Sequence, residues 1–318
     1  MKYIQDILEG EVISEVYFVK KKDELRTKAD KPYYSVILQD KTGTIDAKIW
    51  DVGSAGIGEF SALDYVYISG QVTRFQQALQ VNVQRARKCD EGEYNVSDYM
   101  PVSKFDIEEM YGQLMKYVDS IKNPHLKAIA KSFFVDDKEF ISEFKTHSAA
   151  KSVHHGFIGG LLQHTLGVVK GADFYAGLYP IVDRDLLITA AALHDAGKIA
   201  ELTAFPENDY SDDGQLLGHI YMGAEMITEK CRKLGNIPAK LERELKHCIL
   251  AHHGKLEYGS PKKPALIEAL LLSYVDDIDA KLETFTEALE SGTPDGSGWL
   301  GFNRLFESNI RKTGGTKE

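Results

Sequence analysis

The sequence predicts an α+β protein in two parts, a small five-stranded β-barrel followed by an all-α domain. Residues 1–88 contain short alternating or β-branched runs separated by turn residues, a pattern typical of strands. From about residue 105 onward, apolar residues recur at intervals of three and four, the spacing of amphipathic helices. With 318 residues and 43% hydrophobic composition, the chain is long enough to bury two separate cores.

The first part is expected to contain five strands. They are predicted at residues 11–19, 33–39, 44–50, 65–73 and 78–86. The run Asp40-Lys41-Thr42-Gly43 suits a hairpin turn, and residues 53–60 are the one connection expected to hold a short helix or loop. Five strands in about 80 residues with such a spacer fit a closed barrel of the OB type, with an SH3-like barrel as the alternative.

The second part is expected to be helical. Helical periodicity predicts helices at residues 158–176, 184–196, 217–234, 239–253 and 264–290, and further helices between residues 105 and 144, with Asp106 as an N-cap. Residues 89–104 have little apolar periodicity and are predicted to be a linker. The expected domains are therefore a barrel at 1–88, a helical domain at 105–290 with its core at 146–290, and at 291–318 a Gly-rich loop with a short final helix at 302–311.

The pair His194-Asp195 indicates a metal site, because a His nitrogen and a neighbouring Asp oxygen can bind one ion while the Asp bridges to a second. Among 10 His and 48 acidic residues, roughly one or two such neighbours are expected by chance, so the pair indicates a metal site only together with further candidate ligands. The other candidates all lie in or beside predicted helices: His164, His219, His252, His253 and Asp276. Any one of them could be a structural core residue, but burying so many imidazoles and carboxylates is costly without a shared metal.

The order of these residues resembles the HD superfamily of metal-dependent phosphohydrolases, over about half of the chain. That resemblance implies an all-helical fold in which two metal ions are bound. It assigns the first ion to His164, His194, Asp195 and Asp276, and the second to Asp195, His219 and either His252 or His253. Asp276 matches the family ligand better than Asp277 or Asp279, although the choice between Asp276 and Asp279 stays open.

Such a site hydrolyses phosphate esters without a protein nucleophile. Two ions can activate a water and stabilise the charge of the leaving group, so Asp195 is the expected catalytic centre of the arrangement. Lys198, four residues after His194, could contact the scissile phosphate as a point charge; the alternative is a solvated helix-end lysine. His154 and His155 are candidates for further phosphate contacts or are surface residues.

Charge and aromatic residues make the barrel a candidate for binding nucleic acid. Residues 1–88 carry 13 Lys and Arg against 12 Asp and Glu, whereas the remaining chain carries 25 against 36. Basic residues are predicted in the loop after the first strand and at the end of the fifth strand, and aromatic residues lie along the strands. The main candidates for contacts with a nucleic-acid strand are Lys20, Lys21, Lys22, Tyr33, Tyr34, Trp50, Phe75 and Arg85, with Tyr17 and Phe18 as further stacking candidates. For any one of them, core packing or a solvated loop is the competing interpretation.

The combination of barrel and HD domain resembles the bacterial 3'-to-5' exoribonucleases of the YhaM type, across nearly the whole chain. The stretches that carry this likeness are residues 153–165, 216–219, 250–254, 258–261 and 276–282. The resemblance implies a manganese-dependent enzyme that degrades single-stranded RNA, and in some members single-stranded DNA, from its 3' end. Gln163 and Ala196 depart from the family pattern without touching a proposed ligand. From the ligands alone, iron, cobalt, nickel and zinc remain alternatives to manganese.

Two other functions stay open, an HD phosphohydrolase of small nucleotides with a regulatory barrel and a non-catalytic nucleic-acid-binding adaptor. Cyclic dinucleotide phosphodiesterases and guanosine tetraphosphate hydrolases of the superfamily fit less well, because Gly160, Gly254 and Gly197-Lys198 stand where their motifs place other residues.

The sequence also predicts a soluble, cytoplasmic protein with no membrane partner. It contains no run of about 18 apolar residues, and its N-terminus lacks a charged-then-apolar signal layout. Cys89, Cys231 and Cys248 are scattered and are expected to be unpaired thiols. The oligomeric state is left open.

Overall fold

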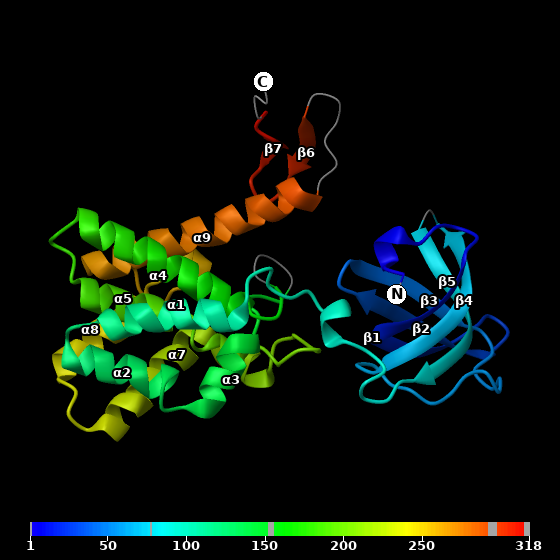
Figure 1. The fold of residues 1–318 in the computed structure, drawn as a ribbon, viewed down its shortest axis with the longest axis horizontal. Helices are drawn as coiled ribbons and strands as arrows, with labels where there is room; N and C mark the ends of the chain where they lie inside the picture. Colours follow the sequence, from blue (N-terminus) through cyan, green and yellow to red (C-terminus); the bar gives the residue numbers. More distant parts are fainter. Residues whose placement is uncertain (1, 77, 152–155, 292–297, 315–318) are drawn as a thin grey trace. The chain divides into compact units, whose positions relative to one another are not determined.

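The structure is a computed structural model that describes residues 2–76, 78–151, 156–291 and 298–314. The chain divides into two compact units, one of Met1–Lys104 with Ala204–Asn208 and one of Phe105–Thr203 with Asp209–Glu318. The first unit holds the barrel and the second the helices, as Figure 1 shows for each. Each unit has its own hydrophobic core.

The first unit contains a closed barrel of five strands. These are β1 (Val12–Arg26), β2 (Pro32–Asp40), β3 (Gly43–Ile49), β4 (Tyr65–Phe75) and β5 (Ala78–Lys88), preceded by a 3-10 turn at Ile4–Asp6. The strand order is β1-β2-β3-β5-β4, with β3 and β5 parallel and the other pairs antiparallel. This order confirms the predicted OB-type barrel over the SH3-like alternative. Alternate residues point inward, and Val19, Leu38, Val66 and Val81 are fully buried.

Strand β1 is longer than predicted, and this changes the setting of the basic residues after it. Lys20, Lys21 and Lys22 were expected in a loop, but they lie on β1, which pairs with β2 as far as Arg26. The register shifts between Val19 and Lys21, so a bulge absorbs the irregularity and the ladder continues. The prediction of a loop was wrong because charged residues on a solvent-facing strand lack an alternating apolar signal.

The predicted linker at 89–104 belongs to the barrel unit. It forms a 3-10 turn at Val96–Asp98, and Tyr99 and Met100 are buried. Tyr94 stacks on Tyr65 of β4 with ring centroids 3.7 Å apart, and the Gln39 amide donates a hydrogen bond to the carbonyl of Tyr99. Aromatic residues without helical or strand periodicity therefore pack this segment against the barrel wall, and it is not a free linker.

The second unit is a bundle of helices. They are α1 (Ile107–Ser120), α2 (Pro124–Phe134), α3 (Lys138–Thr146), α4 (Gly160–Leu178), α5 (Arg184–Leu193), α6 (Lys198–Glu201), α7 (Asp212–Leu234), α8 (Ala239–Leu250) and α9 (Ile267–Ser291). A 3-10 turn spans Leu256–Tyr258. Helix α5 is buried along its length from Leu186 to Leu193, which fits a sequence stretch without charged residues, and α4, α8 and α9 pack against it (Figure 1).

The predicted helices are confirmed, with shifts at their ends. The side chain of Asp106 accepts a hydrogen bond from the backbone N–H of Glu109, as expected of an N-cap. Helix α5 ends at Leu193, so the His194-Asp195 pair lies in the turn directly after it rather than within the helix. Among the described residues, no helix is both long enough and apolar enough to cross a membrane. Cys89, Cys231 and Cys248 are buried free thiols.

The short helix predicted at residues 302–311 is wrong. The structure has two antiparallel strands there, β6 (Trp299–Asn303) and β7 (Ser308–Arg311). Gly301 has φ +87°, which a helix does not permit, and β-branched Ile310 is buried on one side of the hairpin. The Gly-rich segment before it lies largely outside the described residues.

Candidate metal centre and barrel surface

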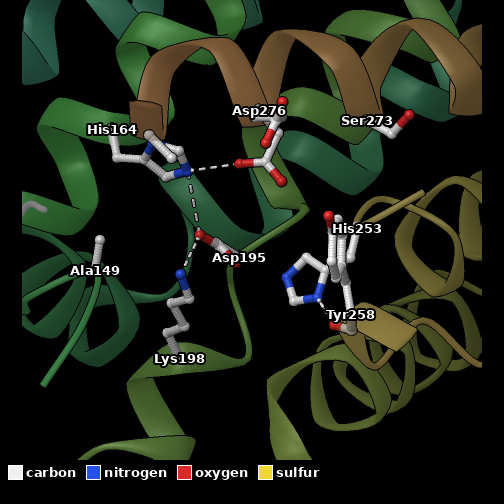
Figure 2. Close-up of a pocket in the computed structure, with 10 residues that line it drawn as sticks. Ala149, His164, Asp195, Lys198, His253, Tyr258, Ser273 and Asp276 are labelled. Atoms are coloured by element: carbon white, nitrogen blue, oxygen red, sulfur yellow. Dashed lines mark hydrogen bonds and ion pairs between the residues drawn. The ribbon is translucent and has the colours of Figure 1, made fainter. Parts of the chain in front are cut away.

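Five elements of the helical unit bring the predicted ligands to one place. His164 comes from α4, His194 and Asp195 from the turn after α5, and Asp276 from α9. The remaining ligands are His219 of α7 and the pair His252 and His253, which directly follows α8. Figure 2 labels His164, Asp195, His253 and Asp276 of this group and shows Asp195 between His164 and Lys198.

A break in helix α7 sets the position of His219. Gly218, with φ +74° and ψ 153°, interrupts the helix immediately before His219, so this histidine begins a new helical segment. A positive φ of this kind is readily adopted only by glycine. The Glu201 carboxylate then accepts hydrogen bonds from both the backbone N–H and the ring Nδ1 of His219, each at 2.9 Å.

The first candidate cluster has four ligand atoms. His164 Nε2 lies 3.2 Å from His194 Nε2, 3.4 Å from Asp195 Oδ2 and 3.1 Å from Asp276 Oδ1. His194 Nε2 lies 3.3 Å from Asp195 Oδ2 and 3.7 Å from Asp276 Oδ1. Ligand atoms held about 2.0–2.2 Å from one ion are roughly 3–3.6 Å apart, which matches these separations.

The second candidate cluster uses the other oxygen of Asp195. Asp195 Oδ1 lies 3.5 Å from His219 Nε2 and 3.7 Å from His252 Nε2. One nitrogen each of His219, His252 and His253 lies within 4.8 Å of the others. The Asp195 carboxylate therefore faces one cluster with each oxygen, which is the position of a bridging ligand.

Each of the five histidines among the candidate ligands has a partner for Nδ1. His194 and His252 donate to the carbonyls of Ala191 and Ile249, and His253 donates to the carbonyl of Tyr258. His164 donates to Asp279 at 2.7 Å, and His219 donates to Glu201. A histidine whose Nδ1–H is engaged in this way presents the lone pair of Nε2, which is the usual arrangement of a metal ligand.

The ionisation of the cluster follows from burial and opposite charges. Burial alone lowers the pKa of His164, but its hydrogen bonds to Asp276 and Asp279 outweigh burial and raise the pKa to about 10. Burial would raise the pKa of Asp195, but Lys198 and His194 beside it hold that pKa well below its usual range. For His252, burial lowers the pKa well below its usual range and keeps the ring neutral.

Three buried atoms in this region test whether the residues fit metal ions. Asp195 Oδ1, His219 Nε2 and His252 Nε2 are buried and make no hydrogen bond. Unsatisfied polar atoms are costly in a protein interior, and here three of them converge with the right donor types for a divalent transition metal. The donor set and its spacing therefore fit metal binding.

The clusters line a cavity of about 280 Å³. Its lining includes the side chains shown in Figure 2, among them Ser273 and Tyr258 at the edges. The Lys198 ammonium lies 2.7 Å from Asp195 Oδ2 and is largely buried, so it points into the site and is not a solvated helix-end lysine. Burial lowers the pKa of Lys198, yet the Asp195 carboxylate outweighs this and holds the pKa above its usual value.

The sequence left two choices of ligand open, Asp276 or Asp279 and His252 or His253, and it did not indicate Glu201. Both His252 and His253 lie in the second cluster. Asp276 joins the first cluster, whereas Asp279 accepts a hydrogen bond from the opposite nitrogen of His164. Asp277 lines the cavity and is paired with Lys281. Glu201 was missed, because no motif marks a carboxylate that binds a ligand's Nδ1. His154 and His155 lie outside the described residues.

The barrel carries an outward-facing group of aromatic and polar side chains. Tyr33 of β2 stacks on Trp50 with ring centroids 4.8 Å apart, and the Trp50 indole donates a hydrogen bond to Asn82 of β5. Trp50 is 52% exposed. Lys48 of β3 pairs with Asn82 in register and donates to Ser35. Lys48 and Asn82 were not predicted, because isolated residues on a strand give no signal until the strands pair.

The other candidate nucleic-acid-binding residues of the barrel differ in how far their side chains are exposed to solvent and in whether they are already paired. Phe75 is 60% exposed, and Lys20 and Arg85 are exposed. Lys22 lies over the rings of Tyr34 and Phe60 and donates to the Phe60 carbonyl, while Lys21 pairs with Asp23. Tyr34 packs partly against the barrel core. Tyr17 and Phe18 are fully buried, so their interpretation as stacking faces was wrong. Tyr17 points into the barrel core, and Phe18, on the opposite face of β1, packs against Tyr65.

The comparisons with known proteins agree with the site. A family model described as the HD domain matches residues 161–281, which confirms the predicted superfamily and its metal-dependent phosphohydrolase fold. The protein named 3'-5' exoribonuclease YhaM of Bacillus subtilis (strain 168) is 34% identical to this chain over 288 residues, which is 90% of each chain. The YhaM protein of Bacillus velezensis is 33% identical over 286 residues, which is 90% of each chain. That of Geobacillus sp. is 35% identical over 265 residues, which is 83% of this chain and 81% of the relative.

The chain belongs to the YhaM family. The resemblance seen in the sequence is thus confirmed over both units, because the matched region of the YhaM relatives exceeds the HD domain on its N-terminal side. Among solved structures, the second OB-fold domain of replication protein A from Methanococcus maripaludis is 21% identical, covering 29% of this chain and 98% of that one with a TM-score of 0.22. The barrel assignment depends on the strand order above and not on this likeness.

Proposed function

We propose that this protein is a metal-dependent 3'-to-5' exoribonuclease that hydrolyses single-stranded RNA to mononucleotides. The observation that carries the proposal is the placement of Asp195, whose two oxygens face two separate groups of His and Asp ligand atoms. The names of the YhaM relatives supply the substrate class and the polarity. Single-stranded DNA is a second substrate of the same chemistry.

The first group of ligands is His164, His194, Asp195 and Asp276, and the second is Asp195, His219, His252 and His253. Two divalent ions bound there would supply an activated water and Lewis-acid stabilisation of the phosphate. We assign manganese on the strength of the family resemblance; iron, cobalt, nickel and zinc suit the same ligands.

The side chains around the ligands have positioning roles in this proposal. Asp279 and Glu201 hold His164 and His219 with Nε2 directed into the clusters. Lys198 is the one lysine or arginine of the cavity lining among the described residues, and its ammonium can contact a phosphate oxygen of the bound strand. Because it lies beside Asp195, a contact with phosphate would place the scissile ester next to the bridging carboxylate.

The barrel supplies the contact with the rest of the strand. The Tyr33–Trp50 stack offers an exposed aromatic face, and Lys48 and Asn82 add a charge and hydrogen-bonding groups on the same strands. Stacking of bases on aromatic side chains tolerates any sequence, which suits a degradative enzyme. Lys20, Phe75 and Arg85 are exposed positions from which the strand's path could continue.

The proposal is tested with a 5'-labelled single-stranded RNA and manganese. The expected result is a descending ladder with release of mononucleotides, and a chelator should stop it. An intact strand together with hydrolysis of mononucleotides would favour the small-nucleotide phosphohydrolase. A strand that binds but stays intact with every metal tried would favour the adaptor.

A further inference from the structure

The β6–β7 hairpin at the C-terminal end of α9 has no role in the proposed chemistry (Figure 1). It is a two-stranded sheet by itself, and such hairpins are marginally stable in water without packing against another element. Despite its small size it carries three exposed large apolar side chains: Trp299 is 41%, Phe302 65% and Leu305 61% exposed, and the latter two are among the more exposed apolar side chains of the described residues. A segment of this kind needs a partner or a function to account for it.

The register of the hairpin separates its two faces. Trp299 pairs with Arg311 and Phe302 pairs with Asn309, while Gly301 pairs with Ile310 between them. The register shifts between Trp299 and Gly301, so the alternation of β6 is interrupted there and Trp299 and Phe302 both fall opposite residues of one face of β7, Arg311 and Asn309. Ile310, which lies between these two on β7, points to the other face. Ile310 is 3% exposed, so the face it occupies is covered and the aromatic face is open.

Two contacts hold the hairpin in place. Phe306 in its turn packs edge-on against Phe285 of α9, with ring centroids 5.1 Å apart, and Ile310 is buried on the covered face. On the open face, the Arg311 guanidinium lies over the Trp299 indole, 5.6 Å from its centroid, which orients both side chains. The open face is therefore a supported surface on which Trp299 and Arg311 are in contact with each other.

The charge of the hairpin is opposite to that of its surroundings. Residues 298–314 carry Arg304, Arg311 and Lys312 against a single acid, Glu307, whereas residues 89–318 as a whole carry 25 basic against 36 acidic residues. Arg304 and Lys312 are exposed, and no acidic side chain within the described residues forms an ion pair with either. A positive, aromatic surface in an acidic unit is complementary to a polyanion with stacking bases.

We propose that the open face of the β6–β7 hairpin, formed by Trp299, Phe302, Asn309 and Arg311, is a binding surface for single-stranded nucleic acid. Bases stack on Phe302 and Trp299, and Arg311 contacts the phosphate backbone. This inference rests on the proposed function, because the ligand is the strand whose end is hydrolysed at the metal centre. It adds a contact in the helical unit itself, separate from the barrel surface.

Because the hairpin lies at a distance from the metal centre, its contribution to binding should depend on the length of the nucleic-acid strand. Phe306 of the hairpin packs on Phe285, which lies nine residues along α9 from Asp276, or about 14 Å at 1.5 Å per residue. A dinucleotide in the metal centre cannot extend that far, whereas a longer strand can. Loss of the hairpin surface should therefore weaken binding of long strands and leave the hydrolysis of a dinucleotide unchanged.

The test compares Phe302→Ala with Phe174→Ala in the full chain. Phe174 on α4 is 63% exposed against 65% for Phe302, so the control removes an equally exposed ring from the same unit. Binding of a long labelled strand is measured by fluorescence anisotropy with a chelator present, and dinucleotide hydrolysis is measured with manganese. Phe302→Ala should raise the Kd of the long strand at least about fivefold, as expected for the loss of one base stack, and Phe174→Ala should not. Arg311→Gln should reduce the slope of log K against log salt by about 0.7.

The outcomes are distinct. Equal Kd values for the two Phe variants, with an unchanged salt slope for Arg311→Gln, overturn the proposal. If Phe302→Ala instead changes the molecular mass in sedimentation while long-strand binding stays intact, the hairpin contacts a second copy of the chain and the proposal is wrong. If the unaltered protein binds the strand but does not degrade it, the proposed exonuclease fails while the hairpin effect can still be measured. If the unaltered protein does not bind the strand at all, both fail.

Discussion

Removing the charge of Asp279 tests whether the partners of the histidine Nδ1 atoms control metal binding. In the structure Asp279 Oδ2 accepts a hydrogen bond from His164 Nδ1 at 2.7 Å, and the side chain is 24% exposed. In Asp279→Asn the side chain keeps its volume and an acceptor oxygen, but it loses the negative charge that favours a strongly donating, correctly oriented imidazole. A change at such a position typically costs 10- to 100-fold in metal affinity or activity.

The expected size follows from the same contact. A hydrogen bond to a charged group contributes about 1.5–3 kcal/mol, and a neutral one about 0.5–1.5 kcal/mol, so the substitution should cost roughly 1–2 kcal/mol. That loss corresponds to a decrease of about 5- to 30-fold in affinity for the ion of the first cluster. The fold should be retained, because the residue is near the surface and its shape is unchanged.

The assay is a manganese titration with two readouts, the heat of binding measured by calorimetry and the rate of RNA hydrolysis at each manganese concentration. The matched control is Asp277→Asn, the same substitution two residues away on α9, at a carboxylate that pairs with Lys281 on the surface. Surface pairs of this kind contribute little, so the control should bind manganese like the unaltered protein. Equal manganese affinities for the two variants would refute the assigned role of Asp279, and with it the reasoning that Nδ1 partners tune this site.

Three further predictions address the other parts of the protein. Asp195→Ala should reduce turnover to background, because the bridging carboxylate faces both clusters. Long-strand binding measured in chelator should stay within about threefold, because the barrel does not depend on Asp195, and retained hydrolysis would contradict the bridging role. Trp50→Ala should weaken long-strand binding by about 1–3 kcal/mol in anisotropy and leave dinucleotide hydrolysis unchanged, and equal losses in both assays would mean that the stack is only structural. The pKa of His164 is raised to about 10 in the metal-free protein, so its ring is protonated at lower pH and must release that proton to bind an ion. Manganese affinity should therefore rise about tenfold per pH unit below pH 10, and calorimetry in buffers of different ionisation enthalpy should detect the released proton. A pH-independent affinity would show that the metal-free ring is neutral.

The elements with strong periodicity could be predicted from the sequence. Helices α4, α8 and α9 follow apolar repeats, α5 follows an apolar run that is buried along its length, and β2 to β5 follow short β-branched runs with turn residues between them. The exceptions have weak local signals. The charged half of β1 and the β6–β7 hairpin were missed because their pairing depends on a partner strand and not on their own composition.

The residue types of the metal centre were also evident from the sequence, because histidines and aspartates at helix ends in this order are rarely brought together without a metal. The sequence left two choices open, between Asp276 and Asp279 and between His252 and His253, and it did not indicate Glu201 at all. Asp276 and Asp279 lie three residues apart on one helix, so both face the site, and only the packing of α9 against α4 decides their roles. At Gly167 of α4 a Cβ would lie 2.0 Å from Asp279 Oδ1, so the Asp279 carboxylate that bonds His164 lies directly against the backbone of α4.

The sequence by itself determined the two-unit architecture, the HD type of the helical unit and the identity of the candidate ligands, because these depend on periodicity and on the chemistry of single side chains. Only the tertiary structure decided which oxygen of Asp195 faces which cluster, which carboxylates position the histidines, and that Trp299, Phe302 and Arg311 share one open face. Those relations join residues far apart in the chain or set the register between strands. They follow from how helices and strands pack, which no local pattern encodes.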